Sequence, residues 1–549
     1  MSDDRPAAPS AAELALVGAG GLVLALLLTL PAWIADHKVI LGTAESEAFS
    51  GAWVLWWAQE EILRTGAAPV FAADLNAPIG RALHALPLLD ALVSLPFHGI
   101  HAATLHNGVA VWELTLAFFG AWLLCRWEGA ARWATLPAAV AFACTPALLS
   151  TFANGPVESF SIGWVALSLA IVRRALSRGG AAWIVGGVLC LGATFLSNPY
   201  HLVFAASAGA PLAILENRGR PWKPWLLRAA LIGGGALAMA VPQLMAISMS
   251  AALSPRGSDA GLEAELRNTH FVRDLLAFVL PTDRFDRPGV PHRVYLGGVL
   301  LLLGLGGHKV ARRWLVIAAI GLVFALGDVV SVAGWRLGPN PLTLLLRQVP
   351  PYSELSSAFR AGVLVSLALG VAAALGLSRL PRRYQGPAAV LATVLVLLDQ
   401  LVVSPTQFPL PVSGADIPAF YRDLGAAPAE TIVLDFILDE GQLNPSRALI
   451  FQTAHRQRLV VDLLPPAPPL DLNPLVRLAQ WDPRGPEQAP TRGLCAGVEQ
   501  LQGLGLRTLV SHTPPDAPFA DPRLGLVAQC GHKIERAGAV AVVQLDANR

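Results

Sequence analysis

The sequence predicts a mainly α-helical protein that crosses a membrane many times and ends in a small α+β domain. Of the 549 residues, 54% are hydrophobic and only 14% are charged, and the mean hydropathy is +0.53. A soluble globular protein carries roughly 25% charged residues. The composition therefore indicates a polytopic membrane protein, and no nucleic-acid partner is expected.

Apolar runs of spanning length recur from the N-terminus to about Val403. A transmembrane helix needs about 20 residues. Met1 to Glu13 lacks the features of a cleavable signal peptide, so the first run is expected to remain as a helix. About eleven helices are predicted, over Leu14–Ile34, Leu105–Cys125, Trp133–Thr151, Phe160–Leu176, Ala181–Leu196, Tyr200–Leu215, Leu226–Ser248, Val294–Gly307, Trp314–Val332, Ala361–Leu377 and Pro387–Val403.

Every second connecting loop is short and basic. Cytoplasmic loops carry an excess of Lys and Arg. The alternation predicts that the N-terminus lies on the cytoplasmic side of the membrane and that the tail after Val403 lies on the outer side. The basic residues of these loops are Arg126, Arg132, Arg173, Arg174, Arg178, Arg218, Arg220, Lys223, Arg228, Lys309, Arg312, Arg313, Arg379, Arg382 and Arg383.

The outer loops are longer than the inner ones, which is typical of loops that carry function. The first, from about Ala35 to His101, contains a Phe/Trp pattern at helical spacing (Phe49, Trp53, Trp56 and Trp57). We expect a helix lying at the membrane surface with these aromatic rings at headgroup depth. "LPLLDALVSLPFHGI" (Leu86–Ile100) is too short to span and predicts a second juxtamembrane helix.

After the transmembrane part (1–403), a Pro-rich linker (404–415) leads to an extracytoplasmic α+β domain (416–549). Strands are predicted at "TIVLDFIL", "ALIFQTAH", "RLVVDLL", "RTLVSH", "GLVAQC" and "VAVVQL", and helices at "LDLNPLVRLAQ" and "LCAGVEQLQGLG". Cys495 and Cys530 can form a disulfide if this domain faces an oxidising compartment. With five cysteines and no CxxC, no metal site is predicted.

Two acidic sites stand out at the outer surface. Glu45 and Glu47 follow the first helix closely in "TAESEAFSGAWVLWW". Paired carboxylates can divide the roles of base and partner, because like charges push their pKa values apart; a solvated turn is the alternative. Glu158, in "NGPVES", is a second candidate, although an acid in the first turn of a helix also complements the helix dipole.

Three further residues are candidates for binding substrate. Arg360, in "SSAFRAG", begins a spanning helix from outside. Its guanidinium can bind a lipid phosphate, or it can snorkel outward as an anchor. Tyr200, in "SNPYH", and His270, in an outer loop, are candidates whose alternatives are an aromatic-belt residue and an ordinary surface histidine.

The chain resembles the bacterial GT-C type membrane glycosyltransferases, which use polyprenyl-phosphate-linked sugars. The likeness rests on "ESEAFSGAWVLWWAQEEILRTGAAPVFAADLNAPIG", "LPLLDALVSLPFHGI", "NGPVESFSIGW" and "LRQVPPYSELSSAFRAGVLVSLALG", and on the tail with "FQTAHRQRLVVD". It implies that Glu47 stands where the family has its catalytic aspartate, Glu158 at the acid of the second loop, and Arg360 at the donor phosphate. Glu in place of Asp moves the carboxylate, and a misplacement of about 1 Å can cost roughly a hundredfold in rate.

The resemblance implies transfer of a hexosyl or pentosyl group, with inversion, from a polyprenyl-phosphate sugar to a hydroxyl of a lipid, glycan or protein acceptor. Glu47 would act as general base and Arg360 would stabilise the leaving phosphate. The sequence leaves the use of a divalent metal open. Two alternatives are a lipid or polysaccharide transporter or flippase, which would place charges near the bilayer midplane, and a non-catalytic membrane scaffold.

Overall fold

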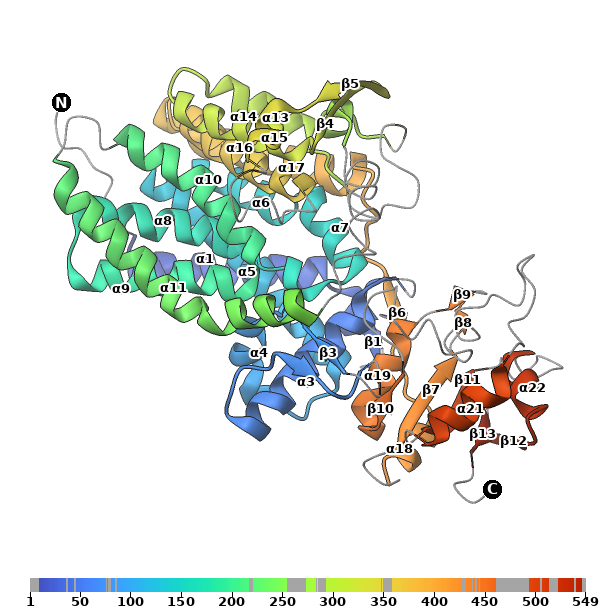
Figure 1. The fold of residues 1–549 in the computed structure, drawn as a ribbon. Coiled ribbons are helices and arrows are strands. Elements are labelled where there is room, and N and C mark those ends of the chain that lie inside the picture. Colours follow the sequence, from blue (N-terminus) through green and yellow to red (C-terminus); the bar gives the residue numbers. More distant parts are fainter. Residues whose placement is uncertain are drawn as a thin grey trace.

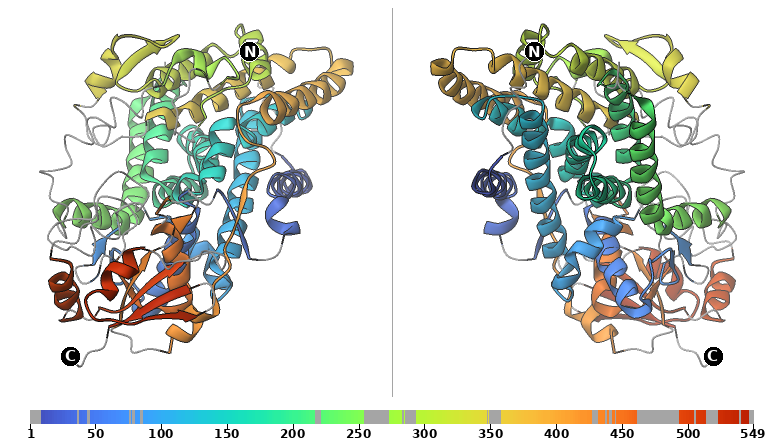
Figure 2. Two further views of the ribbon diagram at one scale, coloured as in Figure 1. Left: turned by 90° about the vertical axis from the view of Figure 1, so that its right-hand side faces the viewer. Right: turned by 90° about the vertical axis from the view of Figure 1, so that its left-hand side faces the viewer.

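The computed structural model describes residues 9–35, 38–43, 46–75, 77, 80–83, 86–216, 221–253, 273–282, 284, 293–346, 348, 358–426, 431–436, 438–439, 442–443, 445–460, 493–503, 506–512, 522–537 and 540–545. A helical bundle fills one part of the molecule. The first outer loop and the C-terminal sheet lie together at one end of it (Figures 1 and 2).

Helices form in all eleven predicted ranges. In the described part of the chain, seven are long and apolar enough to cross a membrane. They comprise α1 (Ala11–Leu28), α5 (Ala102–Trp127), α6 and α7 (Leu136–Ala143, Pro146–Asn154), α8 (Gly163–Arg178), α11 (Trp222–Leu253), α16 (Gly362–Leu377) and α17 (Arg382–Leu398). Those in the other ranges are shorter or less apolar: α9 (Ala181–Ser197), α10 (Pro199–Glu216), α13 (Gly298–Gly306) and α14 (Arg312–Ala325).

The helices differ in how deeply they are buried, and this difference distinguishes those at the centre of the bundle from those at its periphery. In the span that contains α16, 89% of the residues are buried, against 17% in α1 and 28% in α11 and in α17. The exposed residues of these outer helices include many large apolar side chains, such as Leu27, Leu237 and Leu391. A helix that exposes an apolar face to its surroundings is expected where those surroundings are lipid.

The predicted first outer loop (35–101) is a structured unit. It is preceded by α2 (Pro31–Ile34), and it contains β1 (Val39–Leu41), α3 (Ala48–Thr65), β2 (Phe71–Ala72), β3 (Arg81–Ala82) and α4 (Leu88–Ser94). Both predicted helices are present, but the environment expected for the aromatic rings of the first one, α3, was wrong for three of the four rings. Phe49, Trp53 and Trp57 are at most 3% exposed, because α3 packs against α19 (Pro445–His455) of the C-terminal part. These aromatic rings fill a protein core and do not lie at headgroup depth.

The C-terminal part contains a five-stranded sheet with strand order β10-β7-β11-β13-β12. Strands β10 (Arg458–Leu459), β7 (Ile432–Phe436) and β11 (Leu506–His512) are parallel. β13 (Val540–Gln544) is antiparallel to β11 and to β12 (Ile534–Ala537). Upstream of the sheet, β6 (Val412–Gly414) pairs with β1 and so ties the two outer parts together.

Two predicted strands are helices. "ALIFQTAH" lies in α19, and "GLVAQC" overlaps α22 (Pro522–Ala528). Short apolar runs do not distinguish a strand from a buried helix. The missed signals were Pro445 and Pro522, each at the first helical position, where proline is favoured. The predicted helix "LDLNPLVRLAQ" lies outside the described residues, whereas "LCAGVEQLQGLG" contains α21 (Leu494–Gly503) as expected.

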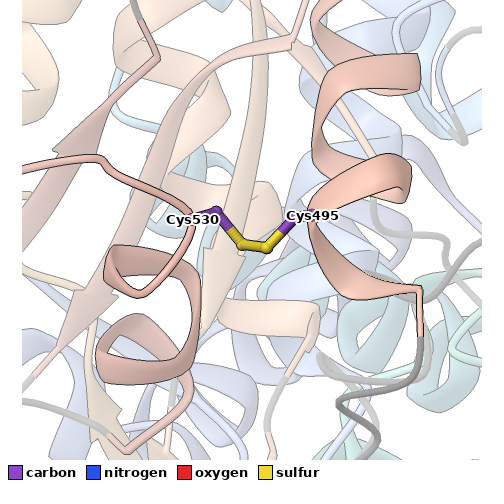
Figure 3. The surroundings of a disulfide bond; sticks show 2 residues. All are labelled: Cys495 and Cys530. Carbon is purple, nitrogen blue, oxygen red and sulfur yellow. A yellow bond between two sulfur atoms is a disulfide. The ribbon is translucent and has the colours of Figure 1, made fainter.

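The remaining described elements are short. They are β4 and β5 (Val329–Val332, Trp335–Pro339), which form a hairpin, α15 (Pro341–Leu346), α18 (Ala419–Leu424), and the strand pair β8 and β9 (Leu438–Asp439, Gln442–Leu443). Cys495 on α21 is joined by a disulfide to Cys530, which follows α22 (Figure 3). The pairing expected for an oxidising compartment is therefore present.

Candidate active site

Close backbone packing brings the loop that carries Glu47 against the loop that carries Glu158. α7 ends at Gly155, whose φ of +80° favours glycine. A Cβ there would lie 2.3 Å from the Cα of Ala48. A Cβ on Gly51 would lie 2.6 Å from the carbonyl oxygen of Gly155. Glycines are therefore required at both positions for the start of α3, with Glu47 as its N-cap, to rest on the Gly155 turn.

Hydrogen bonds fix the same contact from two sides. The backbone N–H of Thr43 donates to the carbonyl of Ala153 at 3.1 Å. From α5, His106 Nε2 donates to the carbonyl of Gly155 at 3.1 Å. The neighbouring Asn107 side chain bonds both Leu41 N and Val39 O of β1 at 2.9 Å. A transmembrane helix thus anchors both acidic loops.

The C-terminal part supports α3 on its other side. Trp53 Nε1 donates to Gln452 Oε1 at 2.6 Å, and both side chains are buried. Gln452 Nε2 in turn donates to the carbonyls of Asp74 and Gln457 at 3.0 and 2.8 Å. The helix that begins beside Glu47 is therefore held between α5 and α19.

The turn that carries Glu158 also organises the start of α10. Asn198 Nδ2 donates to the carbonyl of Glu158 at 2.6 Å. The buried His201 ring lies with Nδ1 3.1 Å from Ser161 Oγ. Tyr200 N donates to Asn198 Oδ1 at 2.8 Å. These bonds place Tyr200 and His201 next to the second acidic loop.

Arg360 lies near Glu47, Glu158 and Tyr200. It belongs to a short 3₁₀ helix (Ala358–Ala361) that leads into α16. The centre of its guanidinium lies 5.8 Å from the centroid of the Tyr200 ring, within cation–π range. It interacts electrostatically with both Glu47 and Glu158. Arg360 Nε has no hydrogen-bond partner among the described residues, so this N–H donor is available for a ligand.

A small cavity adjoins Arg360. It has a volume of about 20 Å³, and its polar lining residues are Thr151, Ser159, His201, Arg293 and Arg360. The Ser159 hydroxyl is buried and has no partner in the described part of the chain. A space of this size holds about one water-sized group. Two guanidinium groups and a hydroxyl around it suit an anionic oxygen better than a sugar ring.

The surroundings of Glu47 alter its acidity. The residue is accessible at the surface of the site, as a group that must reach a substrate has to be. The dense protein around its carboxyl nevertheless raises the pKa of Glu47 above the ordinary 4.5, because desolvation penalises the charged form. The positive charge of Arg360 lowers the pKa in part. A carboxylate with a raised pKa is a stronger base than one in water.

Four of the residues predicted from the sequence come together here: Glu47, Glu158, Arg360 and Tyr200. Glu45 and His270 lie outside the described residues. The sequence reasoning missed Arg293 and Ser159. Arg293 directly precedes the apolar run that leads into α13, the same signal that singled out Arg360. In the described part of the chain, no group of three or more His, Cys, Asp or Glu side chains could hold a metal ion.

The sequence matches no protein-family model and no curated protein. Among solved structures, it resembles the arabinofuranosyltransferase AftD from mycobacteria, with TM-scores of 0.53 and 0.54 and 17% and 16% identity. The likeness covers 99% of this chain but 42% of AftD, so the chain spans less than half the length of that enzyme.

Two other similar structures have lower TM-scores. The oligosaccharyltransferase AglB from Archaeoglobus fulgidus has a TM-score of 0.44 and 13% identity, over 90% of this chain and 69% of AglB. ArnT from Cupriavidus metallidurans has a TM-score of 0.47 and 14% identity, over 96% and 98%. The likeness to AftD, together with the apolar helices, shows that this chain has the polytopic GT-C fold that its sequence resembles.

Proposed function

We propose that the chain is a membrane glycosyltransferase that moves a sugar from a polyprenyl-phosphate donor to a hydroxyl of a lipid, glycan or protein acceptor. One observation carries the proposal. Glu47 and Glu158, from separate loops, both interact electrostatically with Arg360, which lines a small cavity together with Arg293. The proposed base, Glu47, and the proposed phosphate site at Arg360 and Arg293 therefore lie at the same end of the apolar helix bundle. The phosphate of a membrane-embedded donor would lie at such an end.

In the proposed reaction, Glu47 accepts the proton of the acceptor hydroxyl as general base. The acceptor oxygen forms the new bond to the anomeric carbon, and the bond from that carbon to the phosphate oxygen breaks. The electron pair leaves with the polyprenyl phosphate. Arg360 and Arg293 stabilise the charge that develops on this phosphate, as preorganised donors do in other transfer reactions. Glu158, across from Glu47, orients the substrate.

The orientation and the division of the chain belong to the same proposal. The basic loops place the N-terminus in the cytoplasm and the site at the outer face of the cytoplasmic membrane. Residues 1–403 form the transferase part, 404–415 connect, and 416–549 form an extracytoplasmic domain. The Trp53–Gln452 contact supports a bracing role for that domain.

The test is sugar transfer in membranes that contain the full chain, from a panel of polyprenyl-phosphate pentoses and hexoses. Glu47→Gln removes the base but keeps the shape, so transfer should fall by roughly 10²–10⁴-fold. Glu61→Gln is the matched control, because Glu61 lies on the same helix and pairs only with the exposed Arg64 in the described structure. Equal transfer by wild type and Glu47→Gln would refute the base assignment. Movement of lipid across the membrane without transfer would favour a transporter.

A further inference from the structure

Two larger cavities share lining residues and lie away from the candidate active site, among α8, α9, α10 and α11. Figure 1 shows how these four helices are arranged. One, of about 210 Å³, is lined almost entirely by apolar atoms. The other, of about 190 Å³, is lined partly by polar side chains. Arg173, Leu176, Ala213 and Trp225 line both. The two cavities therefore form one groove with an apolar part and a polar end.

The apolar part stays open because one of its walls has short side chains. α10 contributes Ala205, Ala206, Gly209, Ala210 and Ala213, while Trp225 and Ala229 of α11 form the opposite wall. In a bilayer, an apolar groove has no hydrophobic reason to prefer one lipid over another, because lipid tails are as apolar as its walls. Any selectivity must therefore come from the polar end.

At the polar end, the charges do not cancel. Arg173 is paired with two carboxylates, Glu128 and Glu216, so it adds no net charge. Arg228 has only carbonyl partners in the described part of the chain, Leu176 O at 2.8 Å and Ser177 O at 3.5 Å, both through Nη1. Among the described residues, its remaining N–H groups bond no other group and no carboxylate pairs with it, so Arg228 carries an uncompensated positive charge at the mouth of the groove.

The position of Arg228 is fixed by the backbone. Gly179 follows α8 with a φ of +70°, and a Cβ there would lie 2.6 Å from the central carbon of the Arg228 guanidinium. The glycine therefore lets the guanidinium rest against the end of α8. A fixed cation beside a tryptophan at the end of a transmembrane helix is the arrangement that recognises anionic lipid head groups.

We propose that this groove binds an anionic phospholipid, with an acyl chain between α10 and α11 and the phosphate at Arg228. The site is distinct from the proposed donor site. The donor phosphate is assigned to Arg360 at the start of α16, whereas Arg228 packs against the last turn of α8, the end remote from Glu158. A lipid whose phosphate reaches Arg228 comes from the opposite leaflet, which the basic loops assign to the cytoplasm.

The experiment measures bound lipid by native mass spectrometry of the full chain, after reconstitution in an equal mixture of phosphatidylglycerol and phosphatidylcholine. Wild type should retain phosphatidylglycerol in preference. Arg228→Gln should reduce that preference by roughly fivefold, the value of one basic side chain near anionic lipid. Ala210→Trp should fill the groove and displace both lipids. Arg382→Gln, a basic residue at the start of α17, should behave as wild type.

The outcomes separate this proposal from others. An unchanged preference in Arg228→Gln would overturn it, and so would recovery of a polyprenyl phosphate in place of a phospholipid. If Ala210→Trp does not fold, Gly209→Val fills the same wall with a smaller side chain and gives the same readout. The measurement needs no sugar transfer, so a failure of the proposed enzymatic function leaves its result interpretable.

Discussion

Two clusters of Arg and Glu lie at opposite ends of the helix bundle, and they differ in how completely their charges are paired. At the end away from Glu47, Glu128 accepts hydrogen bonds from Arg173, from Arg313 at 2.6 Å and from Trp314 at 2.8 Å. Glu216 bonds the same two arginines. At the end that carries Glu47, Arg360 Nε and the Ser159 hydroxyl have no partner among the described residues.

This difference in pairing indicates what each cluster does. Buried polar groups are normally hydrogen-bonded, so a cluster that satisfies its own members needs nothing else and serves the fold. A cluster that leaves a guanidinium and a hydroxyl open beside a cavity is incomplete without a ligand. Substitutions in the paired cluster should therefore change stability, whereas substitutions in the open cluster should change transfer.

The largest effect is expected at Glu128. Glu128→Gln removes one partner of a buried network and leaves two arginines near one carboxylate, which costs about 3–5 kcal/mol in comparable cases. The free energy of unfolding, measured in detergent, should fall by this amount. Glu61→Gln is the control, because its partner Arg64 is exposed and such pairs are worth about 0–1 kcal/mol. Equal stability of the two variants would mean that the Glu128 network is not structural.

The next effect is expected at the proposed phosphate site. Arg360→Gln should lower kcat by roughly 10²–10³-fold, because the lost donor acts on charge that develops in the transition state. Stability should change little, since Arg360 makes no ion pair within 4.0 Å in the described structure. Arg293→Gln should act in the same direction.

Arg360→Lys is the informative partner of this variant. Lysine keeps the charge but loses the planar guanidinium, so it should restore only part of the rate. Arg379→Gln, at the basic end of α16, should leave kcat unchanged. A loss of stability without a loss of kcat in Arg360→Gln would place Arg360 in the structural class with Arg173.

A smaller effect is expected where the C-terminal part contacts α3. Gln452→Leu leaves the Trp53 N–H and the carbonyls of Asp74 and Gln457 without their partner, which should cost about 1–3 kcal/mol. Arg456→Gln breaks the exposed ion pair between Arg456, directly after α19, and Glu60, and it should cost about 0–1 kcal/mol. Thermal unfolding and transfer rate should both respond to Gln452→Leu, because α3 carries Glu47 at its start. Equal responses to the two substitutions would contradict the bracing role.

The sequence allowed the open cluster to be found in part. Glu47, Glu158 and Arg360 each stand at the boundary of an apolar run, and acids and arginines at such boundaries are conspicuous in a chain with 14% charged residues. Arg293 also stands at a boundary. The sequence reasoning did not single it out, and only packing shows that Arg293 and Arg360 line one cavity.

The environment of α3 could not be predicted for a different reason. The helical spacing of Trp53 and Trp57 is equally consistent with a membrane surface and with a protein core. The partner that decides between them, Gln452, lies 399 residues away from Trp53. Local pattern specifies a helix and its apolar face, but not what covers that face. The same limit explains α19, whose burial against α3 favours a helix where the run alone suggested a strand.

The smallest expected effect is a shift in pH dependence, and it sharpens the comparison by testing whether Glu47 and Arg360 act on one another. As the proposed general base, Glu47 would act in its deprotonated form, and burial raises its pKa above 4.5. Transfer should therefore fall on acidification with a midpoint above that value, and it should be insensitive to this group at higher pH. Arg360 lowers the pKa of Glu47, so Arg360→Gln should move the midpoint of the residual activity to still higher pH. The acid limb of kcat/KM measures both shifts. A midpoint that is unchanged in Arg360→Gln would show that the two groups do not share a site, and the open cluster would then no longer support a common role in transfer.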